Sequence, residues 1–561
     1  MKQELEQAVF RSVSEAFGVQ TNIELSRPDA KFGDYATNAA LQLSKQLGRN
    51  PREIAEELAA LLRTELAETV AEVTIAGPGF INLKLTDAAL AKAAQATPAQ
   101  SLAGQTVIAE YSDPNPFKPL HAGHLYTTLV GDTIARLVEN AGAHVVRINY
   151  GGDVGLHAGK SLWSILQFLG GEVPEKLAAV PEVDRPAWLG SRYVEGNTAY
   201  ETDEAAKAAI VETNKRIYEI HASGDHDSAF AQIYWTTRQW SYDYFAVLYN
   251  QLQVTPFDRY IPESEVTPLG LETVKAQLAR GVYQESDGAV IFDGEAVGLH
   301  TRVFINSAGL PTYETKDVGL LLTKWRDYHF DTSIVITANE QAQYMQVMLA
   351  SVAQFEPEPA RRTHHLTHGI VKMQGGVKIS SRKGNGITAL EILESARQAG
   401  AATGNNSSEE TILAAIKYAF AKNRIGGDIV YDPKESIALE GNSGPYLQYA
   451  HARARSIVAK APQADPTTDL TVAQQLQPDE RTLLRKISEY AEAVDKGVAE
   501  LMPHYICTYL YELAQTFNRF YEKNRVMGDD RQALRLQLVE HYADTLKAGL
   551  EILGISAPDR M

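Results

Sequence analysis

The sequence predicts an α/β protein with three parts: a small N-terminal α/β domain, a central domain built on a parallel sheet, and a C-terminal all-α helical bundle. Three observations support this reading. First, the pattern before residue 100 mixes helices and strands. Second, residues 106–152 show a strand, then a helix, then a second strand. Third, the pattern after residue 411 is wholly helical. The length of 561 residues exceeds what one core accommodates and fits two to four domains.

The N-terminal domain is expected to cover residues 1–100. Its expected elements are helices over 2–17, 36–47 and 51–67 and strands over 70–77 (VAEVTIAG) and 79–85 (GFINLKL). Pro51 at a helix start and the turn at 77–79 (Gly-Pro-Gly) support those boundaries. The loose segment over 95–105 separates this domain from the next.

The central domain is expected over 101–410. TVIAEY (106–111), a helix ending at Gly142 and HVVRINYGG (144–152) read as a parallel crossover unit. Ligands of such sheets bind at the carboxyl edge of the strands, where the proline-rich loop after 111 lies. Residues 155–300 read as an insertion, and the strand–helix alternation returns in four runs. These runs are GAVIFD (288–293), TRVFINSAG (301–309), DTSIVITAN (331–339) and LTHGIVKM (366–373).

The last part, 411–561, is expected to be a helical bundle because its apolar residues keep helical spacing. The expected helices cover 411–424, 480–500, 503–524 and 531–553. A Pro-, Gln- and Asp-rich linker over 461–479 interrupts them.

Composition excludes several classes of protein. Hydrophobic residues make up 44% and charged residues 22%, as in globular proteins, and neither an apolar signal core nor a run long enough to span a bilayer is present. The single cysteine, Cys507, excludes internal disulfides and multi-cysteine sites such as structural zinc. We expect a cytoplasmic protein without membrane contact. The net charge of -17 argues against indiscriminate polyanion binding but permits local basic patches, such as KISSRKGN (378–385).

Two motifs carry the chemistry, and the first is His-Ala-Gly-His at 121–124. It stands at the expected start of a helix, where backbone N–H groups and the helix dipole favour an anion. His121 and His124 can add donors for phosphate oxygens, and Gly123 leaves room for a flat group such as a purine. On the tetrapeptide alone, two histidines that cap a helix are the simpler interpretation.

The second motif is VKISSRKGNGI (377–387), which follows an apolar strand that begins near His368 and Gly369. Lys378, Ser380 and Ser381 give this loop cations and hydroxyls that can close over a triphosphate and stabilise departing pyrophosphate. A basic surface turn is the alternative for such a loop taken alone.

The two motifs in this order resemble the "HIGH" and "KMSKS" motifs of class I aminoacyl-tRNA synthetases. Further segments are similar to the arginyl-tRNA synthetase family and span nearly the whole chain. They are FGDYATN (32–38), EYSDPNPFKPLHAGHL (110–125), NYGGDVG (149–155), YETKDVG (313–319), SGPYLQYAHARA (443–454) and LGISAPDRM (553–561). The resemblance implies an N-terminal domain that contacts the tRNA elbow, a Rossmann-type catalytic core with an insertion, and a helical anticodon-binding domain.

The resemblance also implies the reaction and the partners. L-arginine and ATP, with Mg²⁺ as counter-charge, form arginyl-adenylate and pyrophosphate, and the arginyl group then passes to the 2′-hydroxyl of the terminal adenosine of tRNA(Arg). The family is usually monomeric, so we expect a monomer. His368 and Gly369 are assigned to ATP together with the two motifs.

One position departs from the family pattern. The fourth residue of the second motif, a catalytic lysine in KMSKS, is Ser381 here. In arginyl enzymes with this gap a lysine before the first motif is thought to substitute, and Lys118 occupies that place. Because transition-state charge needs a cation in space rather than at one sequence position, Lys118 is a candidate catalytic residue. A lysine merely exposed in a proline-bounded loop is the alternative.

The resemblance assigns further residues to arginine and tRNA. Guanidinium prefers bidentate carboxylate partners, so acids are expected near the nucleotide site. The assigned arginine contacts are Glu110, Asn115, His121, Tyr313, Asp317 and Gln341, with Tyr313 and Asp317 on one helix face and on the guanidinium. The assigned tRNA contacts are Asn38, Tyr446, Tyr449, Arg453 and Arg455. For the last four, a helix-bundle core with solvated arginines is nearly as good an interpretation.

Three alternatives stay open from the sequence. The chain could be another class I synthetase, a small-molecule nucleotidyltransferase, or a noncatalytic tRNA-binding paralogue. The helical C-terminal domain argues against the second. Both motifs argue against the third, although the serine at 381 keeps it open.

Overall fold

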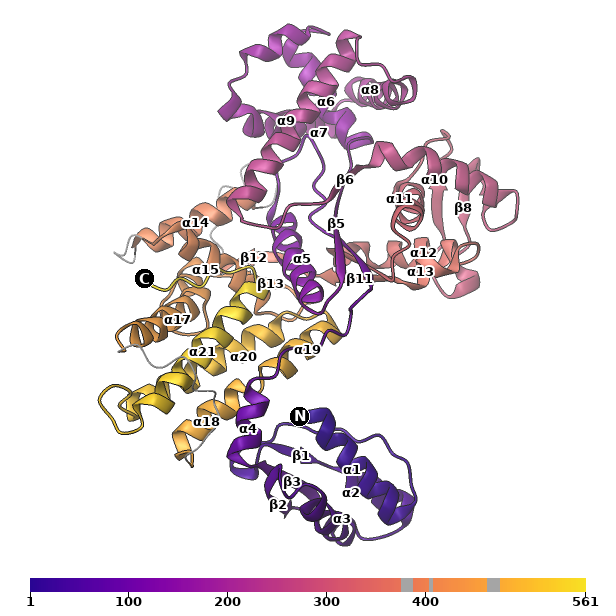
Figure 1. Ribbon diagram of the computed structural model, residues 1–561. Coiled ribbons are helices and arrows are strands. Elements are labelled where there is room, and N and C mark those ends of the chain that lie inside the picture. The colour runs from indigo at the N-terminus through magenta and orange to yellow at the C-terminus, as the bar shows by residue number, and fades with distance from the viewer. Residues whose placement is uncertain (375–386, 403–406, 462–474) are drawn as a thin grey trace.

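The computed structural model describes residues 1–374, 387–402, 407–461 and 475–561. At its centre lies a five-stranded, all-parallel sheet, of which Figure 1 labels β5, β6 and β11. The strand order is β11-β10-β4-β5-β6. The strands are β4 (Thr106–Glu110), β5 (His144–Gly151), β6 (Arg259–Pro262), β10 (Thr332–Ala338) and β11 (Thr363–His368). The crossover unit predicted over 106–152 is confirmed, with α5 (Ala122–Asn140) between β4 and β5.

Alternating residues of the strands fill two separate cores. Val107 and Ala109 of β4 pack with α5 on one face, whereas Ile108 packs on the other with α11 (Tyr313–Tyr328) and α12 (Ala342–Val352). The period of two in a strand explains this division, because successive side chains point to opposite faces. Both faces of the parallel sheet are therefore covered, and its edges at the strand ends stay available for a site.

The region predicted as one insertion over 155–300 is interrupted in the structure. Helices α6 (Leu156–Leu169), α7 (Arg185–Thr202), α8 (Glu204–Ser223) and α9 (Ala229–Gln251) form a unit with its own core. The chain then returns to the central sheet through β6, which pairs with β5. The sequence reading missed β6 because it is four residues long and ends in Pro262, so it lacks an apolar run.

Two of the expected sheet strands belong elsewhere. β8 (Ala289–Phe292) and β9 (Arg302–Ile305) lie with β7 (Gln284–Ser286) in a separate antiparallel sheet. The run LTHGIVKM is split between β11 and β12 (Val371–Met373), and β12 pairs with β13 (Ile429–Tyr431). A short apolar run marks a strand but does not identify its partner, which explains these errors.

The N-terminal domain matches the expected elements closely. Its elements are α1 (Lys2–Phe17), β1 (Tyr35–Thr37), α2 (Ala39–Leu47), α3 (Pro51–Glu65), β2 (Val70–Ala76), β3 (Phe80–Leu85) and α4 (Asp87–Ala94). Asn50 caps α3 through the Arg52 amide, and Pro51 opens the helix as predicted. The helix predicted from 36 instead begins at Ala39, because residues 35–37 form the edge strand β1 against β3.

The C-terminal part is helical as predicted. Its main helices are α14 (Ala389–Ala402), α15 (Glu409–Ala421), α17 (Gly444–Ala459), α18 (Pro478–Ile487), α19 (Tyr490–Glu500), α20 (His504–Lys523) and α21 (Gln532–Ile552). The single helix predicted over 480–500 is two helices, α18 and α19. Most of the linker predicted over 461–479 lies outside the described residues. No helix in the described ranges has the length and apolar character needed to cross a membrane.

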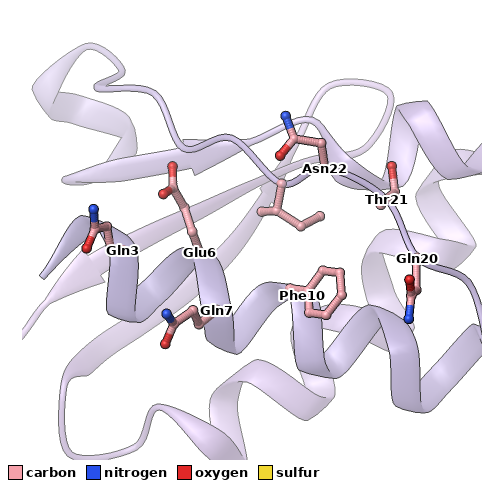
Figure 2. A pocket seen from close by; sticks show the side chains of 8 residues that line it. Gln3, Glu6, Gln7, Phe10, Gln20, Thr21 and Asn22 are labelled. Carbon is pink, nitrogen blue, oxygen red and sulfur yellow. The ribbon is translucent and has the colours of Figure 1, made fainter. Parts of the chain in front are cut away.

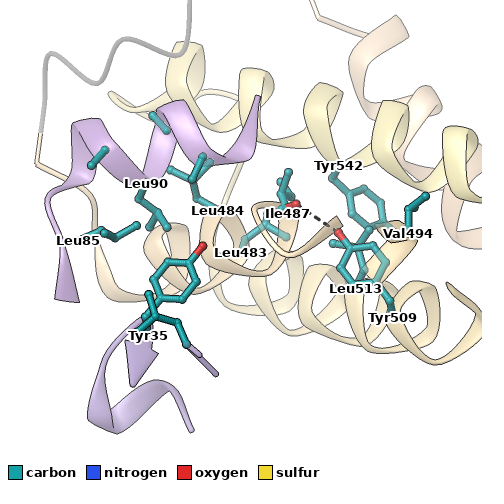
Figure 3. Packing of buried hydrophobic residues seen from close by; sticks show 14 of the residues in the cluster. Tyr35, Leu85, Leu90, Leu483, Leu484, Ile487, Val494, Tyr509, Leu513 and Tyr542 are labelled. Atoms are coloured by element: carbon teal, nitrogen blue, oxygen red, sulfur yellow. Dashed lines mark hydrogen bonds between the residues drawn. The ribbon is translucent and has the colours of Figure 1, made fainter. Parts of the chain in front are cut away.

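The N-terminal domain packs on this helical part through one continuous core. Tyr35, Leu85 and Leu90 lie in the same buried cluster as Leu483 and Leu484 of α18 (Figure 3). Ion pairs surround the apolar contact. Asp34 is buried, accepts the Leu85 amide at 2.7 Å and lies 2.5 Å from Arg481 and 3.4 Å from Arg485. On the same interface, Arg27 and the Tyr35 hydroxyl both reach Glu492 at 2.7 Å.

We expect Asp34→Ala to loosen this interface. Arg481 and Arg485 keep Asp87 and Glu489 as partners, but the buried Leu85 amide loses its acceptor, at a cost of about 1–3 kcal/mol. Hydrogen exchange should show lost protection over residues 1–85 while the central sheet stays protected. Glu57→Ala is the control, because Glu57 and its partner Arg49 are both exposed and the pair contributes about 0–1 kcal/mol. Equal protection in the two variants would contradict the role given to Asp34.

Candidate active site

Residues from or directly after all five parallel strands lie at the carboxyl edge of the central sheet. Glu110 ends β4, His368 ends β11 and Glu263 follows β6 directly. Gln341 lies in the short turn after β10, and Gly152 follows β5. The candidate residues predicted from distant parts of the sequence therefore share one edge, as expected for a parallel sheet.

The two histidines of the first motif cap α5. His121 Nδ1 accepts the amides of Gly123 at 3.0 Å and His124 at 3.4 Å, and His124 Nδ1 accepts the His121 amide at 3.4 Å. The rings stack with centroids 3.8 Å apart. Because each Nδ1 accepts, a neutral ring carries its proton on Nε2. Within the described ranges neither Nε2 has a hydrogen-bond partner, so both rings present a donor for a ligand.

Both rings are held in the neutral form. Desolvation lowers the pKa of His121, and the charge of Lys118 lowers it further. Desolvation also lowers the pKa of His124 well below its usual value, with smaller contributions from His121 and Lys118. The capping interpretation and the donor interpretation of this motif are thus compatible, because capping fixes the tautomer that donates.

Gly123 and His368 border the same space. A Cβ on Gly123 would lie 2.9 Å from the His121 ring and 4.0 Å from the His368 ring, so no other residue fits there without movement. His368 is buried, packs against Tyr126 and has its Nδ1 2.7 Å from the Gly369 carbonyl. A Cβ on Gly369 would approach Asp428 to 2.5 Å. The structure therefore brings His368 to the histidine pair and makes Gly369 a packing requirement.

The loop between β4 and α5 has an unusual backbone. Ser112, Asp113 and Phe117 all have positive φ values, of 77°, 50° and 70°. Non-glycine residues adopt this region at an energetic cost, and such residues concentrate at functional sites. Two side chains fasten the loop to the end of β5. Asp113 accepts the Tyr150 amide at 2.8 Å, and Asn115 Oδ1 accepts the Gly152 amide at 2.9 Å.

Lys118 lies in this loop near the histidines and close to the helical insertion. Its ammonium lies 4.5 Å from the centre of the Tyr193 ring of α7. Desolvation lowers its pKa, and the only opposing influence is the more distant Glu263. No carboxylate of the described residues is within ion-pair distance of Lys118. Lys118 is therefore a cation without an ion-pair partner among the described residues.

Four carboxyl groups and two lysines form the inner part of the site. Glu110 pairs with Lys324 at 2.5 Å, and Glu263 pairs with Lys316 at 2.5 Å; all four side chains are buried. The other two carboxyl groups, Asp113 and Asp317, make no ion pair within the described part of the chain. Desolvation raises the pKa of both well above the usual range, and Glu110 raises each further. The ligand-free site thus holds two carboxyl groups without a cation.

Asp317 and Tyr313 occupy successive turns of α11, as the sequence predicted. Asp317 is 8% exposed and lies near the buried Tyr150 hydroxyl, which has no hydrogen bond of good geometry within the described residues. Tyr313 is 58% exposed at the first turn, with its ring 5.2 Å from the Lys316 ammonium. Asp317 therefore lies at the floor of the site and Tyr313 at its rim.

The second motif lies mostly outside the described residues, including Lys378, Ser380 and Ser381. The residues that follow it are described and contact the first motif. The Ala122 amide donates to the Ile387 carbonyl at 2.7 Å, and the Ala389 amide donates to the Leu120 carbonyl at 2.9 Å. The end of the second motif is thus anchored beside the histidine pair.

The predicted tRNA contacts are not gathered in one place. Asn38 is exposed at the start of α2, in the N-terminal domain. The other four lie on α17, where Tyr449 is exposed and Tyr446 is half-buried with its hydroxyl bonded to Asn518. Arg453 lies over the Tyr521 ring, and Arg455 pairs with Asp544 and Asp559. Of these four, Tyr449 is the side chain most available for stacking.

Sequence reasoning missed Asp113, Glu263, Lys316 and Lys324. Glu263 had a usable signal, because it directly follows a strand of the parallel sheet, as Glu110 does. The lysines had none: Lys324 and Glu110 are 214 positions apart, and Lys316 and Glu263 are 53 apart. Their pairing follows from the fold alone.

One hollow in the N-terminal domain lacks this chemistry. A groove of 690 Å³ in the N-terminal domain is lined by α1 and the segment after it, through Gln3, Glu6, Gln7, Phe10, Gln20, Thr21, Asn22 and Ile23 (Figure 2). None of the predicted catalytic residues lines it. Its amides and single carboxylate offer polar contacts but no converging charges.

Comparison with known proteins now identifies the architecture. The family model of the class I (R) tRNA synthetase catalytic domain matches residues 85–432. The arginyl tRNA synthetase N-terminal domain model matches 1–85, and the DALR anticodon binding domain model matches 447–561. The chain belongs to the arginyl-tRNA synthetase family.

Relatives agree with this membership over the whole length. The arginine–tRNA ligase of Frankia casuarinae is 31% identical, with 99% of this chain and 97% of that protein covered. The arginine–tRNA ligase of Haemophilus ducreyi is also 31% identical, with 97% and 99% covered. The Thermus thermophilus arginyl-tRNA synthetase structure superposes with a TM-score of 0.80 at 26% identity and covers both chains fully. The predicted Rossmann-type core with flanking N-terminal and helical domains is confirmed.

We expect Asp317→Asn to separate stability from arginine binding. The folded-state pKa of Asp317 is raised, so ionising it opposes folding, and this cost grows as pH rises from about 4 through the raised value. The amide removes that cost, so the ligand-free variant should show a higher Tm than wild type at pH 7.5 and no difference near pH 4. Its KM for arginine should rise by at least about 30-fold, as for a lost buried charge pair.

Calorimetry gives a second readout of the same group. Arginine binding requires the ionised carboxylate, so below the raised pKa of Asp317 wild type should release protons on binding, and Asp317→Asn should release fewer. Asp327→Asn is the matched control on the same helix, because Arg326 holds the pKa of Asp327 low, at about 2. An unchanged KM for arginine in Asp317→Asn would remove this residue from the pocket.

Proposed function

We propose that the inner carboxyl cluster binds L-arginine for attachment to tRNA. The observation that carries the proposal is the charge balance: four carboxyl groups face two ammonium groups in the described site. Arginine brings two cations, a guanidinium and an α-ammonium, one for each carboxyl group without an ion pair, while its own carboxylate stays available to react with ATP. A buried acid that stays unmatched also rejects neutral amino acids by factors on the order of 10⁴, without a separate editing site.

The geometry supports one orientation of the substrate. Asp317 at the floor, with Tyr313 at the rim of the same helix, suits a planar guanidinium that takes bidentate hydrogen bonds. Asn115 uses Oδ1 for the Gly152 amide, and within the described ranges its Nδ2 is free to donate to the substrate carboxylate. Gln341 lies after the neighbouring strand, and we propose that it contacts the α-ammonium. Glu110, already paired with Lys324, sets the negative field of the pocket and also reaches the substrate.

ATP is proposed to lie over the start of α5. The Nε2 donors of His121 and His124, together with the amides of the helix start, face phosphate oxygens, and the space beside Gly123 and His368 receives the adenine. The substrate carboxylate attacks the α-phosphorus in line, the bond to the β-phosphate breaks and pyrophosphate leaves with the electron pair. Lys118 from the first motif, with Lys378 and Ser380 from the second, stabilises the departing charge, and Ser381 contributes to ATP binding.

Transfer to tRNA needs no side-chain nucleophile. The 2′-hydroxyl of the terminal adenosine of tRNA(Arg) attacks the adenylate carbonyl, and AMP leaves. The α17 residues Tyr446, Tyr449, Arg453 and Arg455 are proposed to contact the anticodon arm, and Asn38 the elbow. As in the family, tRNA must be bound before arginine is activated, and we propose that the enzyme acts as a monomer in the cytoplasm.

Mg²⁺ is the counter-charge expected for ATP. The described residues contain no group of three or more His, Cys, Asp or Glu side chains arranged to hold a metal. Mg²⁺ is commonly held by substrate phosphates with few protein ligands, so no step is assigned to a metal held by the protein.

The test is tRNA-dependent ATP–pyrophosphate exchange with each of the twenty amino acids. We expect exchange with arginine alone and negligible exchange without tRNA. Exchange with a different amino acid would identify another class I activity. Absence of exchange with all twenty, while tRNA still binds, would identify a noncatalytic tRNA-binding protein.

We expect Lys118→Ala to lower kcat of this exchange by about 10²–10³-fold, as for the loss of one donor to transition-state charge. The KM for arginine should change little, because no carboxylate of the inner cluster pairs with Lys118 among the described residues. Lys92→Ala, at an exposed lysine of the N-terminal domain, is the control. Turnover of Lys118→Ala within a few-fold of wild type would exclude a catalytic role.

A further inference from the structure

The helical insertion holds the loop that carries Lys118. Phe117 is fully buried in the core of the insertion, with its ring 5.8 Å from Tyr234. Its amide donates to Ser241 Oγ of α9 at 2.9 Å. These contacts maintain a residue whose φ is 70°, which a free loop would relax. The conformation of the loop therefore depends on helices that follow it in the chain.

Helix α7 of the insertion contacts the next two residues of the loop. A Cβ on Gly190 would lie 3.5 Å from Pro119, which places the helix surface against the loop. One turn further along α7, the Tyr193 ring lies 4.5 Å from the Lys118 ammonium. Phe117, Lys118 and Pro119 thus each have a partner in the insertion.

The contact partner of Lys118 decides whether its positive charge stays available to a ligand. Most lysines and arginines of the site are neutralised: Lys316 and Lys324 each pair with a buried carboxylate. A carboxylate partner at Lys118 would cancel the field that a departing pyrophosphate needs. An aromatic face attracts an ammonium through its quadrupole without carrying a net charge, so it fixes the position and leaves the cation available.

We propose that Tyr193 is a positioning residue for Lys118, and that α7 of the insertion is thereby part of the activating machinery. The proposal rests on the catalytic role of Lys118 proposed above. Tyr193 itself does not touch the reacting atoms: it restricts the ammonium to the side of the loop that faces His121 and His124. The aromatic ring, rather than the hydroxyl, supplies the effect.

The test is a double-mutant cycle on the full-length enzyme, with kcat and KM of tRNA-dependent ATP–pyrophosphate exchange as the readouts. Tyr193→Leu should lower kcat by about 2- to 30-fold, the range of one cation–π contact. The KM for arginine should stay within twofold. In a Lys118→Met background, Tyr193→Leu should have no further effect. Tyr193→Phe keeps the ring and should restore kcat to within twofold of wild type.

The chain offers a matched control on the same helix. Tyr200 makes the same kind of contact, with its ring 4.2 Å from the Lys160 ammonium, and Tyr193 and Tyr200 are both half-buried. Tyr200→Leu should leave kcat unchanged. If Tyr193→Leu lowers the Tm more than Tyr200→Leu does, Tyr193→Gln serves as a second variant without the ring.

The outcomes separate the two proposals. If Lys118→Met retains wild-type turnover, both the catalytic role of Lys118 and the role of Tyr193 are excluded. Two outcomes with an impaired Lys118→Met variant exclude only the role of Tyr193. In the first, Tyr193→Leu leaves kcat unchanged. In the second, Tyr193→Leu lowers kcat by the same factor with and without Lys118. A Tyr193→Phe variant as slow as Tyr193→Leu would likewise exclude the ring as the positioning group.

Discussion

Burial of carboxyl groups at one edge of the parallel sheet is the constraint around which the catalytic domain is organised. A buried carboxylate without a cation costs several kcal/mol, so each acid must find a partner or hold its proton. Glu110 and Glu263 find lysines on α11, whereas Asp113 and Asp317 do not. Burial raises the pKa of those two acids, so without a cationic ligand the protonated form is favoured. The proposed selection of arginine therefore depends on the electrostatic cost of these acids in the ligand-free form.

Much of the fold could be predicted from the sequence because the local signals were strong. Pro51 after Asn50, the Gly-Pro-Gly turn at 77–79 and the long amphipathic helices after 411 each specify their own boundaries. Partners in sheets were not predictable in the same way. β8 and β9 are apolar runs like β10, yet they form a separate antiparallel sheet, and β6 is too short to give a pattern. Strand identity is local, but strand pairing depends on the whole chain.

In the candidate site too, local motifs could be predicted from the sequence, but contacts between distant residues could not. Residues within recognisable motifs, such as His121, His124 and Asp317, could be named from the sequence. The partners that set their charge states could not, because Lys324 lies 214 positions from Glu110. The histidine pair shows why a structural and a chemical interpretation need not compete. The cap that a helix start requires also fixes the tautomer that presents Nε2–H.

The contact between the N-terminal domain and α18 has a consequence for how the protein is made. Asp34 and Arg481 are 447 positions apart, so at about 5–20 residues per second the ribosome needs about 20–90 s to deliver the second after the first. During that interval the apolar surface around Tyr35, Leu85 and Leu90 has no cover from its own chain. The first domain to emerge is thus the last to be completed, and its exposed face makes the nascent chain a natural client for chaperones.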